Sequence, residues 1–261
     1  MPAVAASNSK AGGDRRPATR FKPIKPLRAH EYVAEQIRRH IALRILQPEE
    51  CLPSERELAV MFGVGRPTMQ QALRLLEAEG LVQARRGRNG GTFVLRPAGD
   101  AAAADLMARI LHHLAEIEDL LVYRSVIEPA IAKRAASSRR SSDLTAMTRA
   151  IHAMAKAETE FEYMRADTEF HLAVAAATHN PLLVRAIEEL RTGLNDVMTL
   201  LPESDTWHRL VDAEHEAIAA AIEAGDEKKA LSVTESHVTN SEQGVRAVLA
   251  GLRRGRTWLT S

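Results

Sequence analysis

Hydrophobic residues recur at three- and four-residue steps near the start of the chain, a spacing that predicts amphipathic helices. The first such run covers residues 31–45 and is followed by Pro48; its apolar positions are Tyr32, Val33, Ile37, Ile41, Ala42 and Ile45. A second helix is expected after Ser54, because Ser54 and Glu57 have the S-x-x-E spacing of a capping box. Gly63 ends that short helix.

A third helix and two short strands follow. The helix begins at Arg66, where the next residue is a proline that suits a first turn, and it runs to Gly80, a natural C-terminal stop. Residues 81–84 and 92–95 are strand-like and flank the basic, glycine-rich segment 85–91, which predicts a β-hairpin. Three helices followed by a hairpin predict a winged helix-turn-helix.

Beyond residue 104 the pattern is helical throughout. Serine, proline and glycine breakers separate seven amphipathic spans, approximately 101–115, 117–136, 142–157, 160–178, 182–200, 205–224 and 227–253. Short connections between such spans favour antiparallel packing, so the fold class is mainly α, with a bundle of six or seven helices after the winged helix. The expected divisions are a disordered arm (1–27), a winged helix-turn-helix domain (28–96), a linker (97–104) and a helical domain (105–253).

Composition agrees with a two-domain globular chain. The length of 261 residues suits two domains at roughly 100–200 residues each. A single cysteine, Cys51, excludes an internal disulfide framework and a four-cysteine zinc site. No apolar run approaches the ~20 residues of a membrane span, and the first residues lack the apolar core of a secretion signal. The expected location is the cytoplasm.

Charge is distributed unevenly along the chain. Residues 1–99 contain 17 Lys and Arg against 9 Asp and Glu, whereas residues 100–261 contain 18 against 25, although the whole chain has a net charge of only +1. A basic first domain and an acidic second one indicate an anionic partner for the first domain alone, and nucleic acid is the obvious candidate.

The third helix and the hairpin carry side chains suited to DNA. The polar side of the helix presents Arg66, Thr68, Gln70, Gln71 and Arg74. In a major groove Arg reads guanine and Gln reads adenine. Arg56, at the start of the preceding helix, is expected to hold a phosphate, and the hairpin tip suits the backbone or a narrow groove through Arg85, Arg86, Gly87 and Arg88.

Several motifs in this first domain resemble the GntR family of bacterial transcription regulators. They are LPSERELA at 52–59, FGVGRPT at 62–68, ALRLLE at 72–77, EGLV at 79–82 and GGTFV at 90–94. The resemblance implies DNA contacts from Arg56, Gly65, Arg66, Thr68, Gln70, Arg86 and Gly87. Gly65 stands where the family usually has Ser or Thr, and Gln70 where it frequently has Arg, so the operator contacts differ from the family pattern.

Histidines are the informative residues of the second domain. Asp167 and His171 are four residues apart on one expected helix and therefore share a face. His215 and His237 lie on two later helices that a bundle can bring alongside. One carboxylate and three imidazoles suit a borderline metal such as Zn, Ni, Co or Mn, although a helical His is more often a surface or capping group.

The motifs around these histidines resemble the FCD ligand-binding domain of the FadR-like branch of GntR regulators. They comprise Arg124-x3-Glu128, Asp167-x2-Phe170-His171, Asn180-Pro181, His215-x6-Ile222, Gly225-Asp226 and His237. Many members of that family hold a divalent metal with one Asp and three His, which implies Asp167, His171, His215 and His237 as ligands, with Zn as the first candidate metal.

The resemblance also implies a small carboxylate effector, an organic or sugar acid, at the open positions of the metal. Arg124 is a candidate partner for that anion, and an ion pair with Glu128 one turn later is an equal alternative. His208 is two turns from His215 and too far to share its metal, and four further histidines have no evident partner: His112, His113, His152 and His179.

Together these features favour a metabolite-responsive transcriptional regulator, a repressor that binds a near-palindromic operator as a homodimer. A metal-dependent enzyme is the alternative, because three His and an Asp with open positions also suit catalysis. His215 lacks the second His of an H-E-x-x-H motif, and no phosphate loop or G-x-S-x-G elbow is present, so we expect no enzyme. An architectural nucleic-acid protein would not need the histidine-bearing acidic bundle.

Overall fold

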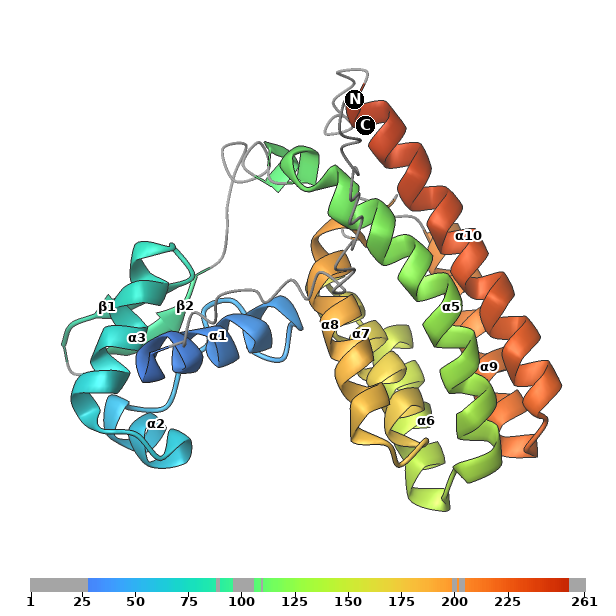
Figure 1. Cartoon of the computed structure of the whole chain (residues 1–261), viewed down its shortest axis with the longest axis horizontal. Coiled ribbons are helices and arrows are strands. Elements are labelled where there is room, and N and C mark those ends of the chain that lie inside the picture. Colours follow the sequence, from blue (N-terminus) through green and yellow to red (C-terminus); the bar gives the residue numbers. More distant parts are fainter. Residues whose placement is uncertain are drawn as a thin grey trace, which may run out of the picture.

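The first part of the chain forms three helices and a two-stranded hairpin, as the sequence predicts (Figure 1). The elements are α1 (Ala29–Ala42), α2 (Glu55–Phe62), α3 (Arg66–Ala78), β1 (Val82–Arg85) and β2 (Gly91–Val94). This computed structural model describes residues 28–87, 90–95, 106–108, 110–198, 201 and 205–253. The expected arm at 1–27 and linker at 97–104 lie outside these ranges, as does Arg88 at the hairpin tip.

Local sequence signals explain the boundaries of α2. The backbone N–H of Glu57 donates to the Ser54 hydroxyl at 3.3 Å, and the backbone N–H of Ser54 donates to the Glu57 carboxylate at 2.9 Å, which is the expected capping box. Gly63 follows with a left-handed backbone (φ 63°), a conformation that lacks a penalty only in glycine. The three helices then enclose one apolar core, which includes Val33, Ile37, Met69, Leu73 and Leu76.

The hairpin is antiparallel, with Val82 opposite Val94 and Arg85 opposite Gly91. The segment after α1 extends this small sheet, because the backbone N–H of Leu52 donates to the Thr92 carbonyl at 2.8 Å. These contacts fix the wing to the helical core, and Val82 and Val94 are both buried in it.

The end of α1 differs from the expectation. The helix ends at Ala42 rather than continuing toward Pro48, and Arg44 adopts a left-handed backbone with φ 58°. Tyr32 and Ile45, which the pattern assigned to the apolar face, are about half exposed. The helix therefore ends in a turn that the periodicity does not reveal, and this turn faces the second domain.

The rest of the chain is helical, as expected. The elements are α5 (Leu114–Ser138), α6 (Ser141–Ala155), α7 (Glu160–Ala176), α8 (Pro181–Met198), α9 (Asp205–Ala224) and α10 (Glu227–Arg253). The first two expected spans meet at a turn at His113, three residues before the expected break. Within the described ranges, no helix is long and apolar enough to cross a membrane.

The six helices form an elongated bundle (Figure 1). Helix α10 lies along α5 and α9, and α7 lies between α6 and α8. Leu121, Phe170, Leu190, Ile218 and Val245 are fully buried and come from five of these helices. This shared core holds the inner faces of α7, α9 and α10 in fixed positions, and those faces carry the polar cluster described next.

Candidate metal centre and nucleic-acid interface

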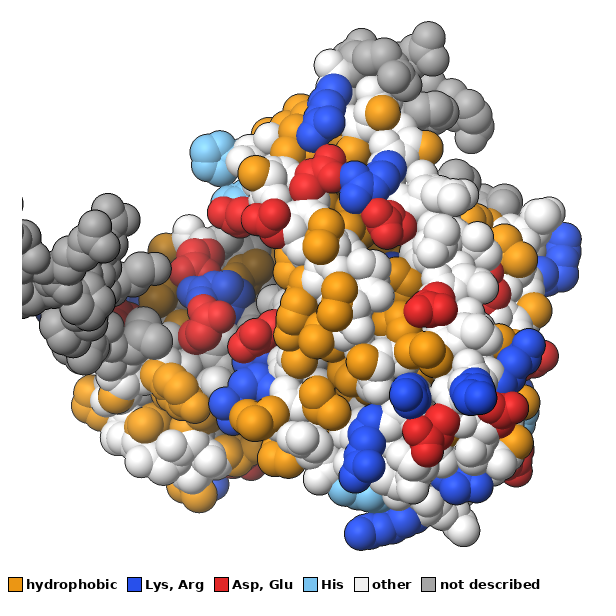
Figure 2. All heavy atoms as spheres, turned by 45° about the vertical axis from the view of Figure 1, so that its right-hand side comes forward, with side chains coloured by type: hydrophobic (Ala, Val, Ile, Leu, Met, Phe, Trp, Pro, Cys, Tyr) orange, Lys and Arg blue, Asp and Glu red, His pale blue; other side chains and the backbone are white. Residues whose placement is uncertain are grey.

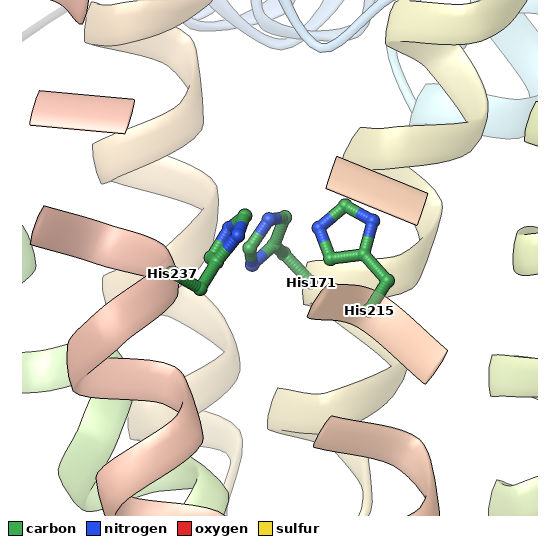
Figure 3. A group of neighbouring side chains, drawn as sticks. All are labelled: His171, His215 and His237. Carbon is green, nitrogen blue, oxygen red and sulfur yellow. The ribbon is translucent and has the colours of Figure 1, made fainter. Parts of the chain in front are cut away.

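Three histidines meet in the middle of the bundle. His171 on α7, His215 on α9 and His237 on α10 point toward one another (Figure 3) and are 5%, 0% and 2% exposed. Each offers a ring nitrogen, and these three nitrogens all lie within 4.8 Å of one another. The structure therefore brings together three of the four side chains that the sequence selected.

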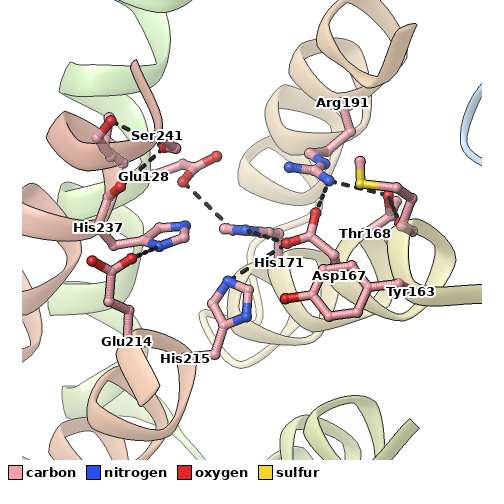
Figure 4. Close-up of polar contacts among 12 residues, drawn as sticks. Glu128, Tyr163, Asp167, Thr168, His171, Arg191, Glu214, His215, His237 and Ser241 are labelled. Carbon is pink, nitrogen blue, oxygen red and sulfur yellow. Dashed lines mark hydrogen bonds and ion pairs between the residues drawn. The ribbon is translucent and has the colours of Figure 1, made fainter. Parts of the chain in front are cut away.

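The fourth, Asp167, lies beside two of these rings but outside the three-histidine set. Its Oδ1 is 3.7 Å from Nε2 of His171 and 3.6 Å from Nε2 of His215. Its Oδ2 pairs with Arg191 of α8 (Figure 4). Burial alone would raise the pKa of Asp167, but Arg191 and then His171 and His215 outweigh it and hold the pKa well below its usual range. Asp167 is thus a carboxylate aimed at the cluster.

Two further carboxylates hold the outer sides of the rings. Glu214 Oε2 is 2.8 Å from Nδ1 of His237, and Glu128 Oε2 is 3.5 Å from Nδ1 of His171 (Figure 4). A carboxylate hydrogen-bonded to one ring nitrogen fixes the tautomer and aims the other nitrogen, as Glu214 does for His237, whereas Glu128 places a negative charge beside His171 without a hydrogen bond. Burial would raise the pKa of Glu128, but Arg124 and then His171 lower it to about 2, so Glu128 stays ionised.

His215 has the donor character of a metal ligand. Neither of its ring nitrogens has a hydrogen-bond partner among the described residues, and the same holds for Nε2 of His171. Burial lowers the pKa of His215 well below its ordinary value, and the nearby His237 lowers it further, so the ring is neutral. Buried polar atoms normally have partners, and a neutral imidazole has a free lone pair. These atoms fit a borderline divalent cation.

Arg124 lies against the same cluster and contacts Glu128, one of the two alternatives that the sequence left open. Its Nε donates to Glu128 at 3.1 Å and its Nη1 to the Ser241 hydroxyl at 2.9 Å. Its Nη2 is 3.2 Å from Nε2 of His237. A guanidinium has five N–H donors, so these contacts leave two for another acceptor.

Two neighbouring cavities lie on the Asp167 side of the cluster. A cavity of about 30 Å³ is lined by Asp167 together with Tyr163, Met164, Trp207 and His208. A surface pocket of about 480 Å³ shares Tyr163 and His208 with it. The Tyr163 ring stacks on His208 at 4.1 Å, and its hydroxyl donates to Asp212 at 3.0 Å. Tyr163 and His208 therefore line both cavities, and Asp167 lines the smaller one.

Two of the remaining histidines have partners that the sequence did not indicate. Nδ1 of His113 is 2.9 Å from Glu116, and Nε2 of His179 is 3.2 Å from Asp143. No partner was evident for either from the sequence, although one carboxylate is three residues along the chain and the other is on a neighbouring helix; both histidines are exposed. His208 lies outside the three-histidine set, as expected.

The candidate DNA contacts lie mainly on the surface of the first domain. Arg56, Gly65, Arg66, Arg86 and Gly87 are exposed, and Thr68 is half-buried. Gln70 is half-buried as well, and its amide donates to Glu55 of α2 at 2.9 Å. That bond engages one amide N–H of Gln70 and leaves its second N–H and its oxygen for other partners.

The two arginines of the wing differ in their contacts: Arg85 is paired within the domain, and Arg86 is exposed. The Arg85 guanidinium is 2.6 Å from Glu49 and lies over the Phe93 ring at 4.5 Å. Arg86 is exposed, and Gly87 has a positive φ of 118°, which suits a tight turn and close approach of the main chain. Arg86 is therefore the better placed of the two for a phosphate.

Sequence reasoning missed Arg191, Asn195 and Glu214. Arg191 and Asn195 fall four residues apart within the buried face of α8, among Ile187, Leu190 and Leu194. Polar residues at core positions of an amphipathic helix were the available signal, because a buried polar group needs a partner. No sequence pattern indicates that Glu214 reaches His237 on another helix.

Comparison with known proteins agrees with this architecture. Residues 29–94 match the model for bacterial regulatory proteins of the gntR family, and residues 119–240 match the FCD domain. The chain is 31% identical to the HTH-type transcriptional regulator LutR of Bacillus subtilis (strain 168) over 204 residues, which cover 76% of this chain and 92% of LutR.

Other relatives are also regulators. The HTH-type transcriptional repressor NanR of Cronobacter sakazakii is 28% identical, with 84% of this chain and 86% of NanR covered. The solved structure of McbR/YncC from E. coli is 16% identical, with a TM-score of 0.48 over 85% of this chain and 99% of that one. The two matched families and the relatives LutR and NanR are transcriptional regulators rather than enzymes. The chain belongs to the GntR family of DNA-binding transcriptional regulators and carries an FCD domain.

Proposed function

We propose that this regulator is a metal-dependent sensor of a small carboxylic acid. Residues 28–96 bind the operator, and residues 105–253 hold a divalent metal, bind the acid and form the dimer. The proposed metal ligands are Asp167, His171, His215 and His237. Zinc is the first candidate metal, and nickel, cobalt and manganese are the alternatives, because mixed imidazole and carboxylate donors suit these metals.

The three-histidine cluster is the observation that carries this proposal. Its nitrogens lie within 4.8 Å of one another, and those of His215 and one of His171 are buried without a partner among the described residues. Leaving such groups unpaired costs about 1–3 kcal/mol each, so a bound cation would satisfy an otherwise unfavourable arrangement. Asp167 supplies a negative charge at the same place, and Glu128 and Glu214 hold two of the rings.

Arg124 is the proposed anchor for the acid. It contacts Nε2 of His237, the lone pair that a cation would also use. A cation held by His237 therefore leaves more Arg124 N–H groups for an anion. The cavity beside Asp167 has only about 30 Å³, room for one or two water molecules. Every acid of the proposed class is larger than that, so its binding must widen the cavity, and the 480 Å³ pocket that shares Tyr163 and His208 is the proposed route of entry.

DNA binding requires two copies if the operator is near-palindromic, because each winged helix reads one half-site. We propose a homodimer formed by the helical domain. Figure 2 shows hydrophobic side chains gathered in a band down this domain. Exposed hydrophobic residues of that domain include three within about one turn of α5: Val122, Tyr123 and Val126. An exposed apolar face of this kind typically marks an interface.

We further propose that the acid lowers operator affinity and so relieves repression in the cytoplasm. The name of NanR, a repressor, supports this direction. A ligand shifts the DNA-binding state only if its affinity differs between the two arrangements of the protein. The acid must therefore favour the arrangement in which the two winged helices no longer fit both half-sites.

The test begins with the metal. Purified protein is stripped with EDTA, loaded with Zn²⁺, Ni²⁺, Co²⁺ or Mn²⁺, and followed by bound-metal analysis and melting temperature. His215→Ala should lose the bound metal and the thermal shift, whereas the exposed His152→Ala should keep both. Equal metal content in the two variants contradicts the assignment.

The second stage tests the acid. A labelled duplex is selected by the wild-type protein from a random-sequence pool, and its anisotropy is followed with a panel of hydroxy acids and sugar acids. An acid that lowers DNA affinity in the metal-loaded wild type and has no effect on His215→Ala supports the proposal. An acid that acts equally on both proteins contradicts metal-mediated sensing while DNA binding stands.

A further inference from the structure

The DNA-binding domain contacts the helical domain directly, through the end of α1. Helix α1 lies against α8, as Figure 1 shows. Nη2 of Arg39 is 3.1 Å from the Glu188 carboxylate. The amide of Asn195 donates to the carbonyl of Ala42, the last residue of α1, at 2.9 Å. The two domains are therefore joined by side-chain contacts as well as by the chain.

The turn after α1 is fixed at the same place. Arg44 has a positive φ of 58°, and its guanidinium lies 5.6 Å from the centroid of the Phe161 ring on α7. A left-handed backbone is uncommon for a residue with a side chain and persists when the surroundings hold it. Here the aromatic contact with α7 and the Asn195 bond hold the turn against both α7 and α8.

Asn195 is also bonded to the helix that carries the cluster. It is 1% exposed, and besides Ala42 its amide donates to the Thr168 hydroxyl at 3.3 Å. Thr168 follows Asp167 on α7, and its hydroxyl accepts a second bond from Nη2 of Arg191 at 3.3 Å. The same Arg191 nitrogen pairs with Asp167. A continuous series of polar contacts thus runs from Asp167 to α1.

Helix α1 in turn is tied to α3. Arg38 donates through Nε and Nη2 to both oxygens of Glu79, at 3.0 and 2.9 Å. Glu79 is the C-cap residue of α3, so this bidentate pair joins the two helices at their ends. Their inner faces share the apolar core of the domain. A displacement of α1 must therefore move α3, which carries Arg66.

We infer that Asn195 is the positioning residue through which the state of the Asp167–histidine cluster reaches the DNA-binding domain. A change at Asp167 alters its pairing with Arg191, which shares the Thr168 hydroxyl with Asn195. Asn195 then changes its hold on Ala42, and α1 carries α3 with it. This inference rests on the proposed function, because it needs the cluster to respond to metal.

Spatial continuity alone does not demonstrate coupling, so the variants must separate this route from simple docking. Asn195→Ala removes the bonds to both Ala42 and Thr168. Thr168→Val keeps the shape of the side chain and the bond between Asn195 and Ala42, but it cuts the link to Arg191. Arg39→Ala is the matched control, because it weakens the contact between α1 and α8 without touching the Asp167 series.

Three measurements are made on each full-length protein: Zn²⁺ affinity by chelator competition, hydrogen exchange of the α1 amides, and affinity for the duplex selected by the wild type. In the wild type we expect Zn²⁺ to alter exchange at the end of α1 and to change DNA affinity by about 5- to 150-fold, the usual range for coupled sites. Asn195→Ala and Thr168→Val should keep Zn²⁺ affinity while this ratio falls to about one. Arg39→Ala should keep the wild-type ratio.

The outcomes distinguish the two proposals. If the wild type binds no Zn²⁺, or binds it without any DNA response, the proposed sensing fails and the inference fails with it. If the wild type responds and both variants respond equally, only the role of Asn195 is overturned. If Asn195→Ala does not fold, the result for Thr168→Val decides. A loss of Zn²⁺ affinity in Thr168→Val also overturns the inference, because Thr168 then only supports the metal cluster.

Discussion

The buried pair of Arg191 and Asp167 provides a quantitative test of the electrostatics of the helical domain. Arg191 is 1% exposed and the Asp167 side chain 8%, so removing one partner leaves the other charge buried. Arg191→Met replaces the guanidinium by an uncharged side chain of similar length and leaves the Asp167 carboxylate buried without this partner. Breaking a buried ion pair in this way costs about 3–5 kcal/mol.

That loss is large for a protein. Total stabilities are about 5–15 kcal/mol, and at this chain length a loss of 3–5 kcal/mol corresponds to a fall in melting temperature of roughly 6–20 °C. The measurement is urea unfolding with EDTA present, so that no metal compensates the carboxylate. In the variant burial raises the pKa of Asp167 with only His171 and His215 to oppose it, and the deficit should therefore shrink as the pH is lowered.

A double variant separates charge from shape. Arg191→Met combined with Asp167→Leu replaces both ions by apolar groups, a change that is often neutral or stabilising. It should be more stable than Arg191→Met alone. A single variant within about 1 kcal/mol of the wild type, or a double variant no better than the single one, would refute the reasoning, since the unpaired charge would then carry no penalty.

Three further predictions concern pH, DNA and assembly. Burial lowers the pKa of His215 and of His237 in the folded protein. The unfolded chain therefore binds more protons than the folded one near and below its own His pKa of ~6.5, and the stability of the metal-free protein should fall as the pH drops through that value. An unchanged urea midpoint between neutral and mildly acidic pH would contradict this. Arg66→Ala should cost ~1–3 kcal/mol in binding to the selected duplex, whereas Arg86→Ala should weaken all sequences evenly and reduce the salt dependence; anisotropy titrations that match the wild type would reject this docking. Light scattering should give about twice 28.7 kDa, and Val126→Asp should shift the mass toward one chain; a wild-type monomer at micromolar concentration argues against the dimer.

Elements with strong local signals were predictable from the sequence. The α2 start follows from the Ser54 and Glu57 spacing, and the hairpin follows from two strand-like runs around a glycine-rich turn. Helices α6 to α10 follow from periodicity between obvious breakers. In each case the determining interactions lie within a few residues, so the local sequence contains them.

Tertiary contacts were harder to predict. Spacing pairs Asp167 with His171 on one helix, but the positions of His215 and His237 depend on how α9 and α10 pack. The early end of α1 depends on Arg44, whose unusual backbone is held by Phe161 more than a hundred residues later. The only sequence indication that Arg191 has a buried partner was its charged side chain on the apolar face of α8.

The rings of Tyr163 and His208, which line both the surface pocket and the small cavity at Asp167, have a kinetic consequence under the proposed function. If the acid enters and leaves through the surface pocket, it passes only when the stacked pair and the Tyr163–Asp212 bond open. Collective openings of packed helices occur over microseconds to milliseconds or longer, far more slowly than diffusion across a pocket. Residence time at the cluster is then set by the motion of α7 and α9 rather than by affinity alone. Under the proposed function, a brief rise in the acid would therefore leave the protein in its altered state after the free concentration has fallen.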